Sequence, residues 1–288
     1  MGDLCVAVDI GGSKMAAGLV DRSGSLAGAR RVPTVPTDDP EVLWAALAAL
    51  VGEVVDGAPS PPTACGVGCG GPMSPGGEEV SPLNIGAWRG FPLRSRLAEL
   101  TGLPTFVDND AKALALAEGW TGAAAGCDDY LAMVVSTGVG GGIVLDGRLL
   151  EGRLGNAGHI GHVVVEPDGR PCACGGRGCL EAEASGTAIA AVTGRPAAEA
   201  RPEVVARTGT LVGRAVASVA NLLDLSLAVV AGSVALGFGE PFFEAARREL
   251  ELRARIEFAA GTRLLPAGLG DEGPLIGAGA VGWRGAGR

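Results

Sequence analysis

The 288-residue sequence predicts an α/β protein built from two lobes of related design. A unit of strand, glycine-rich turn and returning strand occurs twice, first at residues 4–20 and again at residues 131–145. Around both units, short apolar runs alternate with amphipathic runs of helix length, which is typical of α/β folds. The repeat favours two lobes with a ligand between them.

In the first lobe, apolar runs that end at glycine, proline or aspartate predict strands, and amphipathic runs predict helices. The expected strands cover residues 4–10, 15–20, a third run after the turn at 21–24, then 65–69 and 105–107. The expected helices cover residues 41–55, 93–100 and 111–118.

In the second lobe, the same patterns predict strands at 131–135, 143–145 and 148–150, with a glycine turn over 136–142. Polar residues interrupt the apolar tract 215–239, so a helix followed by a buried strand explains it better than a membrane span. We expect the lobes to be residues 1–118 and 119–276, with segment 277–288 packing back on the first lobe.

The composition narrows the range of functions that this protein can have. The net charge of −9 argues against a nucleic-acid partner held by phosphate contacts. The N-terminal residues lack the basic and apolar segments of a signal peptide, and no membrane span is expected, so we expect a cytoplasmic protein. Seven cysteines at irregular spacing, three of them between 172 and 179, indicate a metal site rather than a disulfide framework.

Three glycine turns follow predicted strands, at residues 9–14, 136–142 and 231–233. The first two suit phosphate binding, because glycine leaves backbone N–H groups free to point at oxygens. Asp9 could hold Mg²⁺, through water, and Lys14 stands beside the first turn. Taken alone, each turn is better explained as an ordinary hairpin turn. The absence of a Gly-Lys dipeptide excludes a Walker P-loop, and no turn has the Rossmann pattern.

Asp108, Asn109 and Asp110 stand where a short predicted strand ends and a helix begins. A carboxylate there could accept the proton of a hydroxyl group while the neighbouring amide holds the substrate. The alternative is a helix N-cap, a position that asparagine and aspartate favour.

Histidine and cysteine form the most specific pattern. The only two histidines, His159 and His162, precede Cys172, Cys174 and Cys179 by at most twenty residues. One histidine and three cysteines complete a tetrahedral zinc shell with no vacant position, which is the structural type of site. The alternative, chance clustering of reduced cysteines, explains the spacing less well.

The order of these motifs resembles the ROK family of repressors, open reading frames and sugar kinases. The resemblance runs from DIGGSK through NIGAWRGFPL, the Asp108–Asp110 segment and STGVGGG to the zinc signature and AGSV. It implies a two-lobed, actin-like (ribonuclease H-like) ATPase fold with a structural zinc loop. It also implies ATP, Mg²⁺ and Zn²⁺ as cofactors, a small sugar as substrate and a homodimer.

The resemblance also implies roles for individual residues. Asp110 matches the catalytic base that takes the proton of the sugar 6-hydroxyl. The implied sugar-binding residues are Gly71, Asn84, Asn109, Asp110, His159, His162 and Glu181. The implied nucleotide contacts are Gly11, Gly12, Ser13, Thr137 and Gly138, with Gly232 near the adenine. The implied zinc ligands are His162, Cys172, Cys174 and Cys179.

Three positions depart from the family pattern: Ser13 replaces threonine, Ala231 replaces glycine, and His159 replaces the glutamate of most members. The stretch AGHIGH is similar to the bacterial N-acetylmannosamine kinases, and a neutral histidine can donate a hydrogen bond to an acetamido carbonyl. We therefore expect phosphorylation of the 6-hydroxyl of a hexose or N-acetylhexosamine, with N-acetyl-D-mannosamine favoured. Alternatives are a glucokinase, a kinase of another hexose or a cyclitol, and a substitution at His159 without effect on substrate. A sugar-sensing regulator fits poorly, because the first strand at Leu4 leaves no room for a DNA-binding domain.

Overall fold

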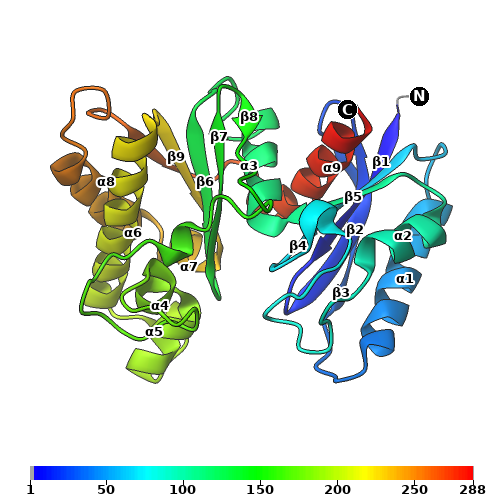
Figure 1. Ribbon diagram of the computed structural model, residues 1–288, viewed down its shortest axis with the longest axis horizontal. Coiled ribbons are helices and arrows are strands. Elements are labelled where there is room, and N and C mark those ends of the chain that lie inside the picture. Colours follow the sequence, from blue (N-terminus) through cyan, green and yellow to red (C-terminus); the bar gives the residue numbers. More distant parts are fainter. Residues whose placement is uncertain (1–2, 288) are drawn as a thin grey trace. The chain divides into compact units, whose positions relative to one another are not determined.

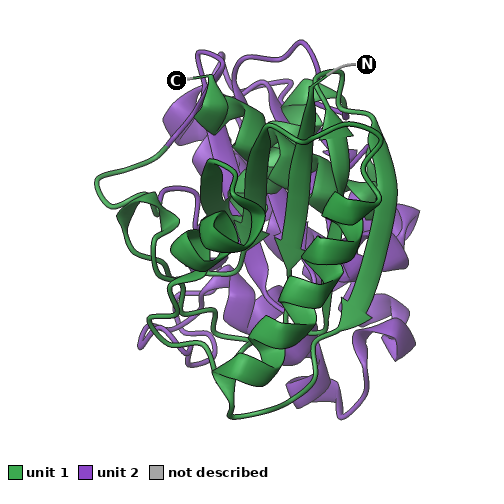
Figure 2. Cartoon of the chain, turned by 90° about the vertical axis from the view of Figure 1, so that its right-hand side faces the viewer, with its two compact units in different colours: residues 1–121, 151–156, 269–288 green, residues 122–150, 157–268 purple. Residues whose placement is uncertain are grey.

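The computed structural model describes residues 3–287, which form two compact units (Figure 2). Unit 1 contains residues 1–121, 151–156 and 269–288, and unit 2 contains residues 122–150 and 157–268. The sequence pattern predicts a boundary near residue 119 and a returning segment at 277–288. In the structure the chain also contributes the short stretch 151–156 to unit 1, and the final return begins at Leu269.

Unit 1 is built on a five-stranded mixed sheet (Figure 1). Three strands form an antiparallel meander, and two further strands run parallel to the first. In spatial order the strands are β3 (Leu26–Pro33), β2 (Lys14–Asp21), β1 (Leu4–Ile10), β4 (Ala64–Cys69) and β5 (Thr105–Asn109). The strands predicted from the sequence are confirmed, and the four whose bounds were predicted agree within two residues at each end.

Helices cover both faces of this sheet (Figure 1). The helices of unit 1 are α1 (Pro40–Asp56), α2 (Leu93–Thr101), α3 (Asp110–Trp120) and α9 (Gly273–Ala286). Alternate residues of β1 explain the two layers: Val6 and Val8 pack with α1 and α2, whereas Ala7 packs with α9. The backbone of α9 lies so close to β4 that a Cβ atom on Gly66 would come within 2.0 Å of the Ala278 carbonyl oxygen.

Unit 2 repeats the strand order and directions of unit 1. Its sheet consists of β10 (Arg263–Pro266), β9 (Leu227–Ala231), β6 (Tyr130–Val135), β7 (Val139–Leu145) and β8 (Arg148–Leu149). Strands β6, β7 and β8 are antiparallel, and β9 and β10 continue the sheet in parallel. This is the topology expected of an actin-like fold, with an α/β unit present twice.

The helices of unit 2 include a long parallel pair. They are α4 (Leu180–Ala184), α5 (Gly186–Thr193), α6 (Pro202–Leu223), α7 (Ser233–Phe238) and α8 (Glu240–Arg253). The pair α6 and α8 packs closely because Gly209 and Gly213 let α6 approach the backbone of α8.

The tract 215–239 contains the end of α6 and the buried strand β9, as the sequence indicated. None of the helices within residues 3–287 has both the length and the apolar character needed to span a bilayer.

One turn is shorter than the sequence predicted. The second glycine turn was expected over residues 136–142, but β7 begins at Val139 and the turn is reduced to residues 136–138. Gly140, Gly141 and Gly142 pair with β6 as strand residues. At Gly141 there is a packing reason for glycine, because a Cβ atom there would lie 3.0 Å from the carbonyl oxygen of Gly158.

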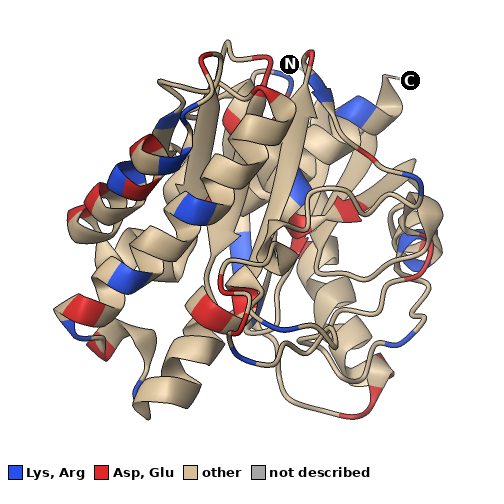
Figure 3. Cartoon of the chain, turned by 60° about the vertical axis from the view of Figure 1, so that its left-hand side comes forward, with Lys and Arg blue, Asp and Glu red and all other residues tan. Residues whose placement is uncertain are grey.

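Charged residues are mixed along the chain. Lys and Arg alternate with Asp and Glu over the helices and loops seen in Figure 3. Many of them form ion pairs within one unit, such as Arg96 with Glu41 at 2.6 Å. On the face that Figure 3 shows, basic residues do not gather into a continuous stripe, in keeping with the acidic net charge.

Candidate functional site

The first glycine turn joins β1 to β2 and is held by hydrogen bonds within the turn and from Thr34. The Gly11 N–H donates to the Lys14 carbonyl at 3.0 Å, and Thr34 ties the turn through its N–H to Ser13 and its hydroxyl to Gly11. Gly12, Ser13 and Lys14 are exposed. A Cβ atom on Gly12 would lie 2.5 Å from the Cβ of Asn84, so the turn and this predicted sugar ligand are neighbours.

Asp9 and Asp110 meet at one edge of the unit 1 sheet. Gly68 of β4 separates them: a Cβ atom there would lie 3.8 Å from an Asp9 carboxylate oxygen and 3.7 Å from the Cα of Asp110. Burial and, next, the negative charge of Asp110 together raise the pKa of Asp9 to about 7, against the opposing effects of Lys14 and Arg31. Asp9 is therefore a carboxyl group that an incoming cation would convert to its ionised form.

Asn109 and Asp110 form the start of α3. The Ala111 N–H donates to Asn109 Oδ1 at 3.0 Å and to Asp110 Oδ1 at 2.8 Å, so the N-cap interpretation of this segment is correct. The functional interpretation is compatible with it, because the Asp110 side chain stays exposed. A Cβ atom on Gly71 would lie 3.5 Å from Asn109 Nδ2, which places Gly71 beside the same turn.

Unit 1 thus gathers one set of predicted residues at the carboxyl ends of β1, β4 and β5. Ligands of open α/β sheets bind at this edge, because parallel strands end there together and loops supply the contacts. The set consists of Asp9, Gly11, Gly12, Ser13, Lys14, Gly71, Asn84, Asn109 and Asp110. The remaining predicted residues belong to unit 2.

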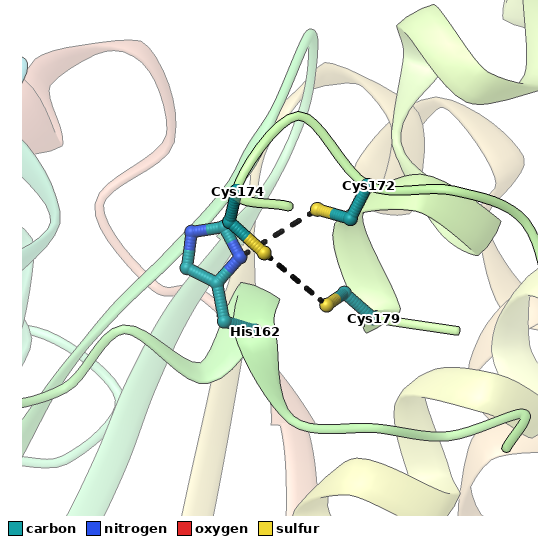
Figure 4. Close-up of side chains that lie close together, drawn as sticks. All are labelled: His162, Cys172, Cys174 and Cys179. Carbon is teal, nitrogen blue, oxygen red and sulfur yellow. Dashed lines mark hydrogen bonds between the residues drawn. The ribbon is translucent and has the colours of Figure 1, made fainter. Parts of the chain in front are cut away.

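Four side chains of unit 2 point toward one another from η2 (Ile160–His162) and the following loop (Figure 4). Their ligand atoms all lie within 4.8 Å of one another, and the residues are His162, Cys172, Cys174 and Cys179. The sulfur atoms of Cys174 and Cys179 are 3.7 Å apart, and Cys172 Sγ lies 3.8 Å from His162 Nδ1. A tetrahedron with ~2.3 Å metal–sulfur bonds has sulfur atoms about 3.8 Å apart, so this set fits zinc.

The loop folds tightly around this cluster. Gly178 has a φ of 68°, and a Cβ atom there would collide with the Glu166 carbonyl oxygen at 1.6 Å. Burial and the neighbouring thiols raise the pKa of Cys179 to about 12, whereas the Gly176 N–H lowers the pKa of Cys174. A cation among the sulfurs would favour the thiolate form of Cys179 against this raised pKa. The four residues would hold that zinc, and it would have a structural role.

The second glycine turn is hydrogen-bonded to the helices that follow residues 163–179, the candidate zinc-binding loop. The Gly186 N–H donates to the Ser136 carbonyl at 2.7 Å, and the Thr187 hydroxyl donates to the Thr137 carbonyl at 2.9 Å. The Val139 N–H donates to Glu181 Oε2 at 2.9 Å, beside Gly138. Glu181, predicted as a sugar contact, therefore braces the second turn.

Gly232 and His159 complete the unit 2 set. Gly232 precedes α7 with a φ of 100°, and a Cβ atom there would lie 2.3 Å from the Val135 carbonyl oxygen, so glycine is required beside the second turn. The exposed His159 ring faces that of His162, with centroids 6.0 Å apart. His159 itself is not in the metal cluster.

Sequence reasoning missed several residues that shape these sites. Thr34 holds the first glycine turn, and Gly68 lies between Asp9 and Asp110. Both act on residues distant in the chain, so no local sequence pattern marks them. Glu183 is buried and binds both Arg170 and Arg207 at the base of the zinc-binding loop. Lys112 is buried close to Asp110, and its rarity was a signal, since the chain has only two lysines.

Comparison with known proteins identifies the family. Residues 5–283 match the model of the ROK family. An N-acetylmannosamine kinase from Escherichia fergusonii is 38% identical over 250 residues, which is 81% of this chain and 84% of the relative. A ROK family glucokinase from Streptomyces griseus, in complex with glucose and AMPPNP, superposes with a TM-score of 0.84 at 31% identity. That match covers 98% of this chain and 99% of the glucokinase.

A ROK hexokinase from Thermus thermophilus gives a similar result. Its TM-score is 0.83 at 34% identity, and the match covers 99% of both chains. Since the family match spans nearly the whole sequence and full-length relatives exceed 30% identity, the chain belongs to the ROK family.

Proposed function

We propose that this protein transfers the γ-phosphoryl group of ATP to the 6-hydroxyl of N-acetyl-D-mannosamine. The chain is a sugar kinase of the ROK family, as its kinase relatives and its full-length family match show. The identity of the sugar is a further proposal, beyond the membership of this family. It rests on His159, which stands at the turn into the zinc-binding loop, and is supported by the 38% identity to an N-acetylmannosamine kinase.

The chemistry of His159 suits an acetamido group. A carboxylate at this position can only accept hydrogen bonds, and so favours sugar hydroxyls. A neutral imidazole donates from one nitrogen and accepts at the other, so it can bind an acetamido carbonyl. Groups left unpaired in the wrong complex cost about 1–3 kcal/mol each, which is roughly tenfold to a hundredfold in selectivity.

The residues of unit 1 provide the chemistry of transfer. Asp110, exposed at the start of α3, accepts the proton of the attacking hydroxyl, while Asn109 and Asn84 hold the sugar. The glycine turn of unit 1 offers backbone N–H groups to the ATP phosphates. Asp9 would hold Mg²⁺ through water, and that ion would neutralise charge on the transferred phosphate.

Glucose is the second candidate substrate. The observation that favours it is the likeness to the Streptomyces griseus glucokinase, whose structure contains glucose and covers 98% of this chain. The residues of unit 1 do not separate the two sugars, because they are assigned to the ring and to the 6-hydroxyl, which both sugars share. The difference is expected at carbon 2, where we place His159.

The decisive experiment compares kcat/KM for N-acetylmannosamine, N-acetylglucosamine, glucose and mannose with ATP and Mg²⁺. We expect N-acetylmannosamine to be the best substrate, and His159→Glu to shift the preference toward glucose by ~10-fold or more. His159→Gln is the matched control, because an amide keeps one donor and one acceptor, and it should retain the acetamido preference. A tenfold preference of the unmodified enzyme for glucose would establish the glucokinase alternative instead.

A further inference from the structure

Lys112 occupies an unusual position for a lysine. It lies in the first turn of α3, two residues after Asp110, and its side chain is only 2% exposed. A buried ammonium group is strongly destabilising unless it is paired and hydrogen-bonded. The surroundings of Lys112 must therefore be built to receive its charge.

Three acceptors surround the ammonium group. Its Nζ lies 2.9 Å from Asp108 Oδ1, 2.5 Å from Glu151 Oε2 and 3.1 Å from the Gly155 carbonyl oxygen. An ammonium group has three donor hydrogens, so each can be matched by one acceptor. Arg284 of α9 completes the charge balance, donating to Glu151 Oε1 at 2.8 Å. Two cations and two carboxylates thus form one neutral group, the Lys112 network.

The network holds the turn that carries the candidate base. Asp108 Oδ1, bound to Lys112, also accepts the Asn109 N–H at 2.8 Å. The backbone that leads from β5 into Asn109 and Asp110 is therefore fixed through the same carboxylate. Without the ammonium group this partly buried carboxylate would lose its strongest partner, since the nearest Arg284 nitrogen is 4.0 Å away.

The network also holds a second segment. Residues 151–156 belong to unit 1, although the chain on either side of them belongs to unit 2. Lys112 binds this segment near both of its ends, through Glu151 and Gly155. The chain then continues to His159, three residues beyond the segment, and to His162. One side chain thus fixes two stretches that each lead into candidate site residues.

We propose that Lys112 is a positioning residue for the reaction. Its ammonium group sets the placement of the turn 108–110, and with it Asp110, and anchors the segment 151–156 from which the chain runs to His159. This inference rests on the proposed function for the roles of Asp110 and His159. A purely stabilising ion pair would instead affect the folded fraction and leave turnover per folded molecule unchanged.

The test replaces Lys112 with methionine, which has similar length but neither charge nor donors. We expect kcat to fall ~10-fold to 100-fold with a smaller change in KM, because displacement of a reacting group by about 1 Å has effects of this size. Hydrogen–deuterium exchange should become faster in peptides covering residues 108–112 and 151–156. Arg30→Met is the matched control, since Arg30 forms an exposed ion pair with Glu53 in the same unit, and it should change neither quantity.

A milder variant keeps the test decisive if Lys112→Met folds poorly. Glu151→Gln preserves shape and removes one charge of the network, 41 positions from Asp110 in the sequence. It should lower kcat and speed exchange in both segments, by less than Lys112→Met. Normal kcat together with normal exchange in the segments of either folded variant would overturn the proposal.

The exchange measurement also separates this inference from the proposed function. If the unmodified protein prefers glucose, kcat is measured with glucose and the same fall is expected. If it phosphorylates none of the four sugars, the proposed function fails. Exchange in the two segments still decides whether Lys112 holds them: faster exchange in Lys112→Met supports the network, and unchanged exchange refutes it.

Discussion

Asn109 has two tasks at the start of α3. Its Oδ1 accepts the Ala111 N–H, a cap that contributes ~1 kcal/mol in typical helices, while its Nδ2 faces Gly71. Asp110, the next residue, accepts the same N–H and keeps an exposed carboxylate. Single residues of this site therefore combine a structural hydrogen bond with a group proposed to act on the substrate, and a substitution must be chosen to separate the two.

Asp110→Asn makes that separation. The amide keeps the oxygen that accepts the Ala111 N–H, so the helix start should be preserved, whereas the proton acceptor is lost. We expect kcat to fall ~10²–10⁴-fold, the usual effect of removing a general base. Sugar affinity, measured by isothermal titration calorimetry, should change far less. Near-normal turnover of the variant would assign the base to another residue.

Asp9 should make folding stability depend on pH. Burial and Asp110 raise its pKa from 3.8 to about 7 in the folded protein, so between these values the folded state holds a proton that the unfolded state has released. The stability that this group contributes is therefore complete below pH ~4 and falls as pH rises toward 7. The full effect is at most ~4 kcal/mol, at 1.36 kcal/mol for each pH unit.

Asp9→Asn removes this dependence. As the pH is raised from 5 to 8, without Mg²⁺ or nucleotide, the Tm of the variant should therefore rise relative to the Tm of the unmodified protein. Asp21→Asn is the control. Hydrogen bonds from Ser23 and Ser25 lower the pKa of Asp21, so that its titration lies below this range. A Tm difference for Asp9→Asn that stays constant from pH 5 to pH 8 would contradict the assignment.

Among the structural elements, the zinc-binding loop has two kinds of support. Its tip contains the four residues that would hold zinc, and its base is held by the buried carboxylate of Glu183. Glu183 accepts the Arg170 N–H at 2.6 Å and an Arg207 guanidinium N–H at 2.7 Å. Although burial raises its pKa, these two partners lower it overall, so the anchor is ionised at neutral pH. The base should therefore persist when the tip is disturbed.

Removal of zinc should loosen the tip of this loop before the unit unfolds. Purified protein is expected to contain about one zinc per chain by elemental analysis. Cys174→Ser should lose the metal, speed hydrogen exchange at residues 170–179 and weaken sugar binding, since His159 and Glu181 flank the cluster. Cys127→Ser, at a thiol outside the cluster, should keep zinc and activity. Full activity of zinc-free protein would exclude a role for the metal in the site.

Across the whole molecule, the two units repeat one topology. In each, a glycine turn joins the first two strands, and a parallel strand follows on the other side of the first. Each unit also has its own apolar core, with Leu47 and Leu97 at the centre of one and Leu211 and Phe242 in the other. Because the cores are separate, each glycine turn is supported by its own sheet.

The protein is expected to form a homodimer. Leu222 and Leu252 are 79% and 65% exposed at adjacent ends of α6 and α8, and covering such side chains is favourable. Sedimentation velocity should give roughly twice the 28.6 kDa chain mass. Leu222→Asp should weaken the dimer, whereas Leu83→Asp, at a leucine that is 72% exposed in unit 1, should not. A monomer at all concentrations would refute dimerisation, and an intact Leu222→Asp dimer would place the interface elsewhere.

The sequence alone predicted the features that depend on neighbouring residues. Strands and helices followed from apolar periodicity and from glycine, proline and aspartate at their ends. The candidate metal ligands were recognisable because three of the four lie within eight residues of one loop. The start of α3 was expected at residue 111, from the residue types that cap helices, and lies at Asp110.

Tertiary structure decided the rest. Asp9 and Asp110 are neighbours only because β1, β4 and β5 lie side by side, and the Lys112 network joins segments 39 or more positions apart. The extent of the second glycine turn depended on pairing with β6 and on contact with Gly158. Periodicity reports which face of an element is buried, but not which distant element covers it. That choice depends on strand order and close packing, which arise only when the whole chain folds.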